Sequence, residues 1–369
     1  MLRIIFTGGG TAGHILPNTA VIKEVRTGTE AARNGNGGKI PNADCRILYI
    51  GSHKGLEKQI CAKAGIDFDG IFTGKFRRYF SINNFFDLFK IPLGLAQALF
   101  ILRRFKPQVV FSKGGYVAVP VVVAAKMLGI PVVIHEGDYI PGFANKICAK
   151  FADKICVTFP ETRGFDIKKT ILTGMPVRTE GDGGMKEERR HERPTVLIMG
   201  GSLGAESINR ATWNILPKLL RHANIIHITG KGKTGIKSIS KKLDNYKQIE
   251  HADEELFDFY AQSSLVVSRA GASAIAEIAA NHKPSILIPL GKKASRGEQI
   301  ANATYMQSIG ASEIVYQNEK FEYELAQKII ALINDEKKLE KMSTSGKAFG
   351  GLCRNSARKI AKILLSYSH

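Results

Sequence analysis

A glycine-rich turn near the start of this sequence has the spacing of a phosphate-binding loop. Residues 7–14 read TGGGTAGH, in which Gly8, Gly10 and Gly13 give the pattern G-x-G-x-x-G. The turn follows a short aliphatic run and precedes a helical pattern, so free N–H groups at a helix N-terminus would face an anion. Enzymes that bind a dinucleotide also need an acidic residue where the second strand ends. That strand ends at Ser52 without a carboxylate, which disfavours a nicotinamide-dependent enzyme.

Two further turns between a strand and a helix lie in the second half of the chain. One reads MGGSLGA at residues 199–205, and the other reads SRAGASAIAE at residues 268–277. Glycine turns in both halves predict a pair of anion sites at the carboxyl ends of two parallel sheets. Glu277 would lie in the first turns of a helix, where its carboxylate can accept hydrogen bonds from sugar hydroxyls. The plainer alternatives are that the glycines only allow positive φ and that Glu277 only complements the helix dipole.

Alternating strands and helices must position these turns. Short β-branched runs are followed by longer helical patterns throughout, which predicts an α/β fold with mostly parallel sheets. Residues 179–194 are rich in Gly, Glu, Lys and Arg, so we expect a linker there, and residues 27–43 have the composition of a surface loop. The predicted organisation is a domain at 1–178, the linker, a second domain at 195–350, and an amphipathic C-terminal helix at 351–369 that packs toward the first domain.

The composition limits the classes of protein to which this chain can belong. Its 53 Lys and Arg against 33 Asp and Glu give a net charge of +20, so an anionic partner is expected. A nucleic-acid-binding protein would explain the charge, but no recognisable nucleic-acid module is present, and we expect no such partner. Five cysteines without a C-x-x-C pair predict neither a disulfide framework nor a zinc site. Apolar stretches stay under the ~18 residues that span a bilayer, so no transmembrane helix is expected.

A segment rich in basic and aromatic residues occupies positions 75–106. Aromatic and aliphatic side chains beside lysine and arginine suit shallow insertion into an anionic bilayer surface. The alternative is that the aromatic side chains belong to the core and the charges form a solvated rim. The basic residues are Lys75, Arg77, Arg78, Lys90, Arg103, Arg104 and Lys106, and the apolar ones are Phe76, Tyr79, Phe80, Phe85, Phe86, Phe89, Leu99, Phe100 and Ile101.

Six motifs occur together in an order that resembles one family. They read GGGTAGHILP at 8–17, KGGY at 113–116, HE at 135–136, GMPVR at 174–178, GGSLGA at 200–205, and SRAGA at 268–272 followed by Glu277. As a set they are similar to the MurG family, the peripheral membrane N-acetylglucosaminyltransferases of bacterial peptidoglycan synthesis. The resemblance extends from Gly8 to Gln299.

The resemblance implies a fold, a reaction and partners. The fold is GT-B, with two Rossmann-like, doubly wound domains, the active site in the cleft between them, and the donor UDP-N-acetylglucosamine on the second domain. The acceptor is lipid I and the product is lipid II, with inversion at the sugar carbon that bonds to the muramoyl 4-hydroxyl. No metal or other cofactor is required, and the enzyme works at the cytoplasmic face of the cell membrane. The alternative is another GT-B transferase with a lipid acceptor such as diacylglycerol.

Position by position, the resemblance also implies substrate-binding residues. The family usually has Asn where this chain has Asp138, which adds a negative charge near the substrate. Near the donor sugar and its phosphates, the implied residues are Thr11, Ala12, Gly13, Arg178 and Ser202. Nucleotide and phosphate contacts fall on Ala272, Ser273, Ala274, Ile275, Ala276 and Glu277, with Glu277 on the ribose. The sugar hydroxyls contact Glu298 and Gln299, and the set is completed by Tyr116, Asp138, Asn145 and Arg269.

Inversion requires a base that removes the proton of the acceptor hydroxyl while its oxygen attacks the anomeric carbon. We favour His14, because an imidazole titrates near pH ~6.5 and the glycine turn would aim it into the cleft. His135 and Glu136, at the end of another strand, are the rival bases. A plainer alternative is that His14 only hydrogen-bonds the loop or a phosphate. Asp67 and Asp69 match the D-x-D metal motif of a different glycosyltransferase fold, but we expect them to cap an ordinary strand.

Overall fold

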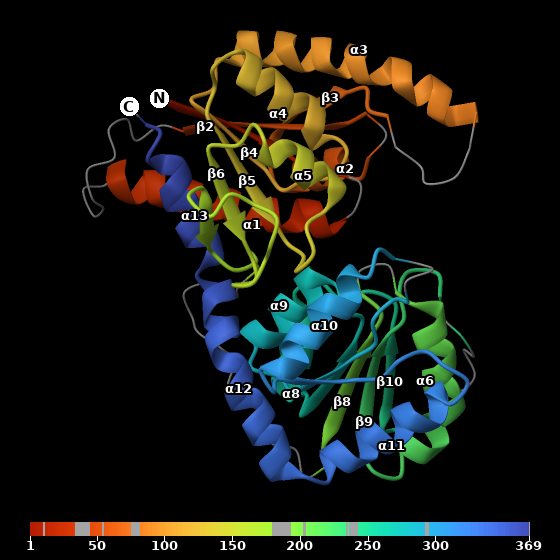
Figure 1. The fold of residues 1–369 in the computed structure, drawn as a ribbon. Coiled ribbons are helices and arrows are strands. Elements are labelled where there is room, and N and C mark those ends of the chain that lie inside the picture. The colour runs from red at the N-terminus through yellow and green to blue at the C-terminus, as the bar shows by residue number, and fades with distance from the viewer. Residues whose placement is uncertain are drawn as a thin grey trace. The chain divides into compact units, whose positions relative to one another are not determined.

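The computed structural model describes most of the chain as two compact units (Figure 1). One unit comprises Met1–Arg178 and Arg354–His369, and the other comprises Thr179–Cys353. The expected linker falls almost wholly outside the described residues. These are residues 1–9, 12–33, 45–53, 55–74, 82–178, 193–201, 204–233, 235, 243–291 and 295–368, without the side chains of residues 12, 14, 30–33 and 82–89.

The first unit is built on a sheet whose described strands have the order β3-β2-β1-β4-β5-β6-β7. All neighbouring strands are parallel, as a chain of βαβ units requires. The chain leaves β1 toward β2 and β3 and then returns to β4 on the other side, so the direction of winding reverses between β1 and β4. The strands are β1 (Leu2–Thr7), β2 (Cys45–Ser52), β3 (Asp67–Ile71), β4 (Val109–Ser112), β5 (Val132–Glu136), β6 (Lys154–Val157) and β7 (Thr170–Leu172).

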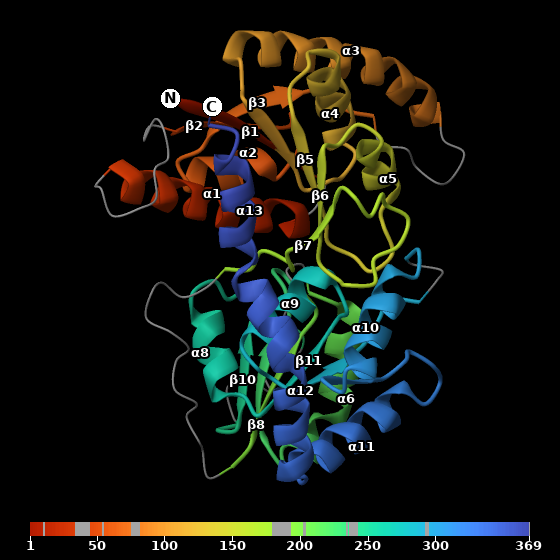
Figure 2. The same ribbon diagram turned by 60° about the vertical axis from the view of Figure 1, so that its left-hand side comes forward.

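Helices cover both faces of this sheet, and each face has its own apolar core. Ile5 of β1 belongs to the core that α3, α4 and α5 close, whereas Ile4 and Phe6 belong to the core that α1, α2 and α13 close. Alternation of this kind is expected of a strand that is buried on both faces. Figure 2 shows α3 and α4 on the side of the sheet away from α1 and α13. The helices are α1 (Ala12–Arg33), α2 (Glu57–Lys63), α3 (Ile82–Phe105), α4 (Ala118–Met127), α5 (Phe143–Ala149) and α13 (Ser356–Leu365).

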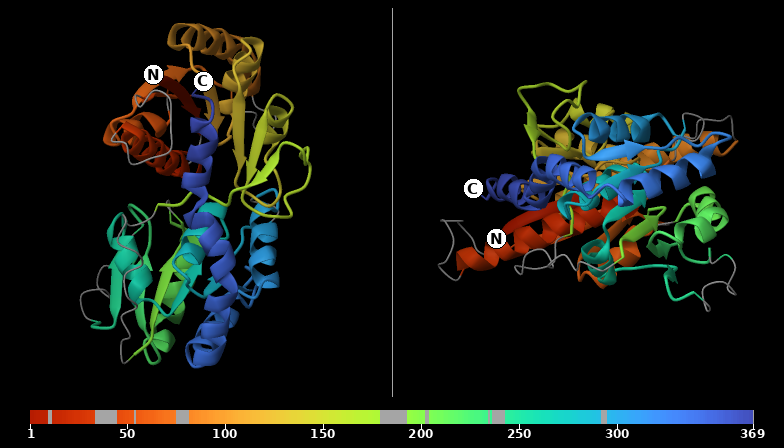
Figure 3. Two further views of the ribbon diagram at one scale, coloured as in Figure 1. Left: turned by 90° about the vertical axis from the view of Figure 1, so that its left-hand side faces the viewer. Right: turned by 90° about the horizontal axis from the view of Figure 1, so that it is seen from below.

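The last helix of the chain, α13, belongs to the first unit although it follows the second unit in sequence. It lies beside α1 in Figures 2 and 3. Ser356 Oγ donates a hydrogen bond of 2.7 Å to the carbonyl oxygen of Gly174, and Arg358 Nε lies 3.6 Å from Glu24 Oε2 on α1. Five apolar side chains of α13 are buried against α1 and the sheet, namely Ala357, Ile360, Ala361, Leu364 and Leu365.

One prediction about the first unit is wrong. The composition of residues 27–43 predicts a surface loop, but α1 continues to Arg33. A Cβ at Gly28 would lie 3.0 Å from Leu365 Cδ1, so α13 crosses α1 closely at this point. Thr29 is buried, and its Oγ1 donates 2.7 Å to the carbonyl oxygen of Arg26. Packing against α13 therefore stabilises the helix where glycine alone would disfavour it. The rest of the predicted loop lies outside the described residues.

The second unit repeats this plan with the described strand order β10-β9-β8-β11-β12-β13, again all parallel. One face is packed by α6, α11 and α12, and the other by α8 and α9. The strands are β8 (Thr195–Met199), β9 (Asn224–Ile228), β10 (Tyr246–Ile249), β11 (Leu265–Ser268), β12 (Ser285–Leu287) and β13 (Ser312–Ile314). The helices are α6 (Glu206–Leu219), α8 (Glu255–Gln262), α9 (Ala272–Ala280), α10 (Glu298–Ser308), α11 (Phe321–Ile333) and α12 (Glu336–Arg354).

Both units are therefore α/β with parallel sheets that are wound in two directions. The predicted fold class is confirmed on this point. Within the described ranges, no helix combines the length and the apolar character that crossing a membrane requires.

Candidate functional site

The carboxyl ends of β1, β4 and β5 meet at one edge of the first sheet. The winding reverses between β1 and β4, and open α/β sheets bind ligands beyond the strand ends at such a point. The N–H of Gly9 donates 3.3 Å to the carbonyl oxygen of Gly114, and the N–H of Lys113 donates 3.0 Å to that of Thr7. Gly115 has a φ of +85°, and a Cβ there would clash with the carbonyl oxygen of Gly9. The loops after β1 and β4 therefore touch through their backbones.

Two buried polar side chains support the first glycine turn from behind. Tyr49 Oη on β2 donates 2.6 Å to the carbonyl oxygen of Gly8. Asn18 Nδ2 on α1 donates 3.0 Å to Tyr49 Oη and 3.3 Å to the carbonyl oxygen of Thr7. Burial raises the pKa of Tyr49, so its hydroxyl stays protonated and can donate. Glycine spacing does not predict this pair, and its one signal in the sequence is an asparagine on the apolar face of α1.

The expected residues of the first turn are described only in part. Thr11 falls outside the described residues. Ala12, Gly13 and His14 form the start of α1, directly after the turn, but the side chains of Ala12 and His14 are not described. The role of His14 as a base therefore stays a prediction.

His135 of β5 is fully buried and makes a fixed hydrogen bond. Its Nε2–H donates 2.8 Å to the carbonyl oxygen of Gly174, the same oxygen that accepts from Ser356 of α13. Burial, and then the charge of Lys113, hold the pKa of His135 well below its usual value, so the ring is neutral. Its Nδ1 has no hydrogen bond to a described residue. In this conformation His135 acts as an enclosed donor.

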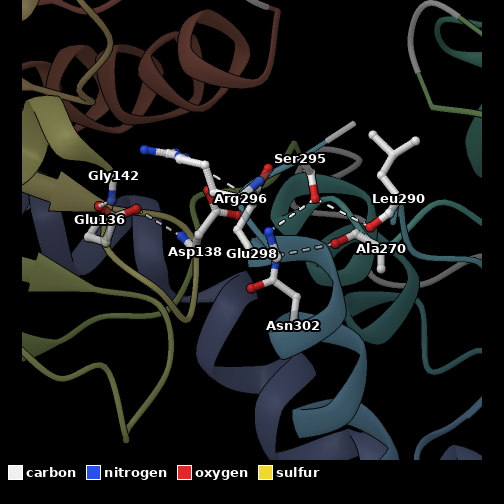
Figure 4. Close-up of polar contacts among 10 residues, drawn as sticks. Glu136, Asp138, Gly142, Ala270, Leu290, Ser295, Arg296, Glu298 and Asn302 are labelled. Carbon is white, nitrogen blue, oxygen red and sulfur yellow. Dashed lines mark hydrogen bonds and ion pairs between the residues drawn. The ribbon is translucent and has the colours of Figure 1, made fainter. Parts of the chain in front are cut away.

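Glu136, the last residue of β5, accepts three hydrogen bonds on its carboxylate. The N–H groups of Asp138 and Gly142 donate at 2.9 Å each, as Figure 4 shows, and Asn145 Nδ2 donates at 3.0 Å. Asn145 Nδ2 also lies 3.1 Å from the carbonyl oxygen of His135. These three donors fix the direction of the carboxylate and engage both of its oxygens. The structure thus brings these four expected residues together, with Glu136 tying the loop at 137–142 to the strand.

The other expected residues of the first unit have simpler surroundings. Tyr116 is half-buried before α4 and packs against the core beneath α3 and α4. Arg178 is half-buried at the end of the unit. The D-x-D match on β3 is engaged by a cation, because Arg104 Nη2 lies 2.7 Å from Asp69 Oδ2. Over the described part of the chain, no group of three or more His, Cys, Asp and Glu side chains is arranged to hold a metal ion.

A polar network supports the glycine turn after β8 in the second unit. Gly204 has a φ of +68°, and a Cβ there would clash with the carbonyl oxygen of Thr229. Asn209 Nδ2 on α6 donates 2.8 Å to that same oxygen, and its Oδ1 lies 3.1 Å from His227 Nε2. His227 Nδ1 lies 3.0 Å from Tyr246 Oη. Burial lowers the pKa of His227 to about 3, so the network is neutral at ordinary pH.

At the start of α9, only half of the side chains that are expected to bind substrate are partly exposed. Gly271 precedes the helix, and Asn302 Nδ2 of α10 donates 3.1 Å to the carbonyl oxygen of Ala270 (Figure 4). Ser202 falls outside the described residues. The side chains that pack inward are Ala272, Ile275 and Ala276, whereas the partly exposed ones are Ser273, Ala274 and Glu277. Residues of the first group can therefore reach a ligand only through their backbone.

Arg269 and the loop before α10 are held by hydrogen bonds within the second unit. Arg269 is 9 % exposed, and its guanidinium donates to Ile288 O at 3.1 Å, to Gln317 Oε1 at 2.7 Å and to Ser207 Oγ at 2.7 Å. All three acceptors are neutral, so the guanidinium joins the loops after β12 and β13 to α6 and keeps its positive charge.

Glu298 and Gln299 also make contacts within their own loop. Glu298 Oε2 accepts 2.7 Å from the N–H of Arg296, and Gln299 Oε1 accepts 3.1 Å from the N–H of Leu290. Ser295 Oγ accepts from the N–H of Gly297. It also donates to the carbonyl oxygen of Leu290, as Figure 4 shows. The amide nitrogen of Gln299 has no hydrogen bond to a described residue, so it is available to a ligand.

Both halves of the chain match domains of one enzyme family. Residues 4–157 match the N-terminal domain of glycosyltransferase family 28, and residues 195–362 match its C-terminal domain. The UDP-N-acetylglucosamine–N-acetylmuramyl-(pentapeptide) pyrophosphoryl-undecaprenol N-acetylglucosamine transferase of Geobacillus thermodenitrificans is 42% identical, over 93% of this chain and 94% of its own. The protein of the same name from Clostridium perfringens is 44% identical over the same shares.

Solved structures agree with these relatives. The crystal structure of Acinetobacter baumannii MurG matches with a TM-score of 0.75 at 25% identity, over 99% of this chain and all of the other. The calicheamicin glycosyltransferase CalG4 matches with a TM-score of 0.67 at 14% identity, over 99% of this chain and 98% of the other, and it supports the fold alone.

The second glycine turn provides a test that compares two glycines. Gly201 and Gly204 both have positive φ, but only Gly204 lies against a carbonyl oxygen, since no described atom lies within 4 Å of a Cβ at Gly201. Gly201→Ala should lower the free energy of unfolding by about 1 kcal/mol, the cost of positive φ for a residue with a Cβ. Gly204→Ala should lower it by about 2 kcal/mol or more, because the clash adds to the strain. Urea unfolding measures both, and equal losses would contradict the close approach to Thr229.

Proposed function

Because the chain belongs to glycosyltransferase family 28 and, within it, to the MurG N-acetylglucosaminyltransferases, we propose that it forms lipid II for peptidoglycan synthesis. It transfers N-acetylglucosamine from UDP-N-acetylglucosamine to the muramoyl 4-hydroxyl of lipid I, with inversion. The observation that carries this proposal is an identity of 42–44% over more than nine-tenths of the chain with transferases named for this donor and acceptor.

The two units have different substrates in this proposal. The first, residues 1–178, takes the acceptor and docks on the membrane, and the second, residues 195–350, takes the donor. Each sheet has a glycine turn at its carboxyl edge, where backbone N–H groups and a helix N-terminus favour an anion. The donor is a nucleoside diphosphate and the acceptor carries a lipid-linked diphosphate, so each unit has an anion to bind.

Partly exposed polar groups of the second unit support donor binding. Glu277 and Ser273 lie on the exposed side of the start of α9, and the amide nitrogen of Gln299 is available at the start of α10. The carboxylate of Glu277 would accept hydrogen bonds from ribose hydroxyls. The charge of Arg269, held among neutral acceptors, favours the diphosphate without touching it. Arg178, Ser202 and Glu298 complete the proposed donor contacts.

The reaction is a single displacement at the anomeric carbon. The acceptor hydroxyl oxygen forms a bond to this carbon as the bond to the UDP oxygen breaks, a base takes the hydroxyl proton, and UDP leaves as an anion. Backbone N–H groups of the glycine turns and Arg178 offset the charge on the leaving group. Of the three candidate bases, His135 is enclosed and neutral and Glu136 is engaged by three donors, so His14 at the start of α1 remains the best candidate.

Sugar transfer from labelled UDP-N-acetylglucosamine to a short-chain lipid I analogue tests the activity. The assay includes EDTA, with UDP-glucose and UDP-galactose as competing donors and diacylglycerol as the competing acceptor. We expect transfer that is independent of metal and selective for the N-acetyl sugar and for lipid I. Transfer to diacylglycerol alone would point to the other lipid-directed transferase. Binding of UDP without any transfer would reject the proposed acceptor.

Substitution of His14 tests the identity of the base. His14→Ala should lower turnover by ~10²-fold or more and remove the acid limb of the pH profile, because the proton would have no acceptor in the transition state. Binding of UDP-N-acetylglucosamine, measured by calorimetry, should be largely retained. His222→Ala, which removes an exposed histidine after α6, is the matched control. A near-normal rate for His14→Ala would assign the proton to His135, Glu136 or solvent.

The described part of the basic and aromatic segment supports peripheral docking at the cytoplasmic face of the membrane. Leu93 and Phe100 on α3 are 48 % and 66 % exposed, and they share one face of the helix with Arg104. The Arg104 guanidinium lies 5.9 Å from the centre of the Phe100 ring. Ile101 is buried in the core and Leu99 packs against it, so the core interpretation holds for these two residues. An exposed apolar row beside arginines suits an anionic lipid surface.

Liposome binding tests this surface. Leu93→Ser combined with Phe100→Ser should lower the fraction bound to vesicles that contain phosphatidylglycerol, because exposed apolar area near the basic residues is lost. Activity on a soluble acceptor should stay unchanged. Ile167→Ser is the matched control, since Ile167 is 86 % exposed in the connection between β6 and β7. Equal binding by the double variant and the parent would exclude this face. The side chains of Phe85, Phe86 and Phe89 fall outside the described residues.

A further inference from the structure

Lys113 is a buried cation to which the sequence motifs and the proposed chemistry assign no role. It directly follows β4 and is 3 % exposed. Its Cβ lies 3.2 Å from the position of a Cβ on Gly8, and its Nζ lies 2.8 Å from that of a Cβ on Gly137. The side chain therefore extends along the carboxyl edge of the sheet, from the turn after β1 to the loop after β5. A larger residue than glycine at position 137 would occupy the place of the ammonium.

The ammonium is compensated by charge at a distance, without direct hydrogen bonds. Among the described residues, its Nζ makes no hydrogen bond and no ion pair within 4 Å. Burial lowers the pKa of Lys113, and the carboxylates of Glu136 and Asp138 oppose this shift. Burial of an ammonium is costly unless opposite charges lie near. One such charge, Glu136, ends β5 and the other, Asp138, lies on the loop after it, so the cation and this loop depend on each other.

The same loop carries Asp138, one of the substrate-binding residues that the family resemblance implies, and it belongs to the unit to which the proposed function gives the acceptor. Glu136 accepts from the N–H groups of Asp138 and Gly142, which sets the course of the loop up to α5. Asn145 lies on α5 and contacts Glu136 and His135. Without the ammonium, no buried cation would offset the negative charges of Glu136, which is buried, and of the partly exposed Asp138.

We propose that Lys113 is a positioning residue of the acceptor site, whose buried ammonium compensates Glu136 and Asp138 and thereby holds the loop at residues 137–142. The proposal rests on the proposed function only in naming the acceptor as the ligand of this loop. It also explains how the Asp138 carboxylate is tolerated, because its added negative charge has a buried positive counterpart directly after the neighbouring strand, β4. Lys113 acts through the loop and not on the reacting atoms.

The charges around His135 provide a readout that is independent of activity. The groups around this ring are Lys113 after β4, the neutral thiol of the paired Cys156 on β6, the carbonyl oxygen of Gly174 and the hydroxyl of Ser356 on α13, which donates to the same oxygen. Burial lowers the pKa of His135 most, the positive charge of Lys113 lowers it further, and backbone hydrogen bonds with Gly174 and with its own residue oppose both. Removal of Lys113 should therefore make His135 easier to protonate.

A double-mutant cycle with Lys113→Met and Asp138→Asn tests the proposal on the full-length chain. Lys113→Met should raise the KM for the lipid I analogue about tenfold with little change in the KM for the donor. Asp138→Asn in the Lys113→Met background should restore most of this loss and raise the unfolding temperature. In the parent background, Asp138→Asn should lower the unfolding temperature, because it leaves the ammonium less compensated. The effect of Asp138→Asn on the unfolding temperature thus changes sign between the two backgrounds, and a lysine without a charge interaction with Asp138 would not produce this change.

Nuclear magnetic resonance of the histidine rings completes the test. The titration of His135 should move to higher pH in Lys113→Met and stay in place in Lys126→Met, which removes an exposed lysine of α4. Independent effects of the two substitutions, or an unmoved His135 titration, would overturn the proposal. The proposal would also be overturned if Lys113→Met fails to fold and the added Asp138→Asn substitution does not restore folding. The titration of His135 and the unfolding temperatures are measured without sugar transfer. They can therefore support the role of Lys113 even if the transfer assay rejects the proposed function.

Discussion

Close approach of one backbone to another at glycine is the constraint on which both halves of this protein depend. At the carboxyl edge of the first sheet, Gly115 leaves room for the carbonyl oxygen of Gly9. At the carboxyl edge of the second sheet, Gly204 leaves room for the carbonyl oxygen of Thr229. Each approach joins a loop that follows one strand to the loop or strand end beside it. The described parts of the two turns are thus set in place before any ligand arrives, which lowers the entropic cost of binding.

Buried polar groups that stay neutral keep these turns in position. Tyr49 and Asn18 support the first turn, and Asn209 with His227 supports the second. Burial holds Tyr49 protonated and His227 unprotonated, so neither network changes its charge near neutral pH. Charged side chains at the carboxyl edges of the sheets are held in place by several hydrogen bonds each. Glu136 is met by three donors and Arg269 by three neutral acceptors, so the direction of each side chain is fixed by hydrogen bonds.

The sequence predicts the parts of this structure that depend on local patterns, and it misses those that depend on distant contacts. Alternating apolar runs predicted two α/β halves, and glycine spacing located both turns, because these signals lie within a few residues of each other. The sequence does not predict the helix at residues 27–33, because Gly28 is held in it by packing against Leu365, which lies at the far end of the chain. Lys113 was passed over for a similar reason. Its partners, Glu136 and Asp138, meet it only once β4 and β5 pair.

The place of α13 has a consequence for how the chain is made. Ribosomes release a protein from its N-terminus, and domains tend to fold as they emerge. The second unit is complete before α13 has been synthesised, whereas the first unit must wait for the last residues of the chain to cover Val21, Ile22 and Val25 on α1. During this interval an apolar stripe stays open to chaperones or to aggregation. The unit that is translated first is therefore the one that is finished last.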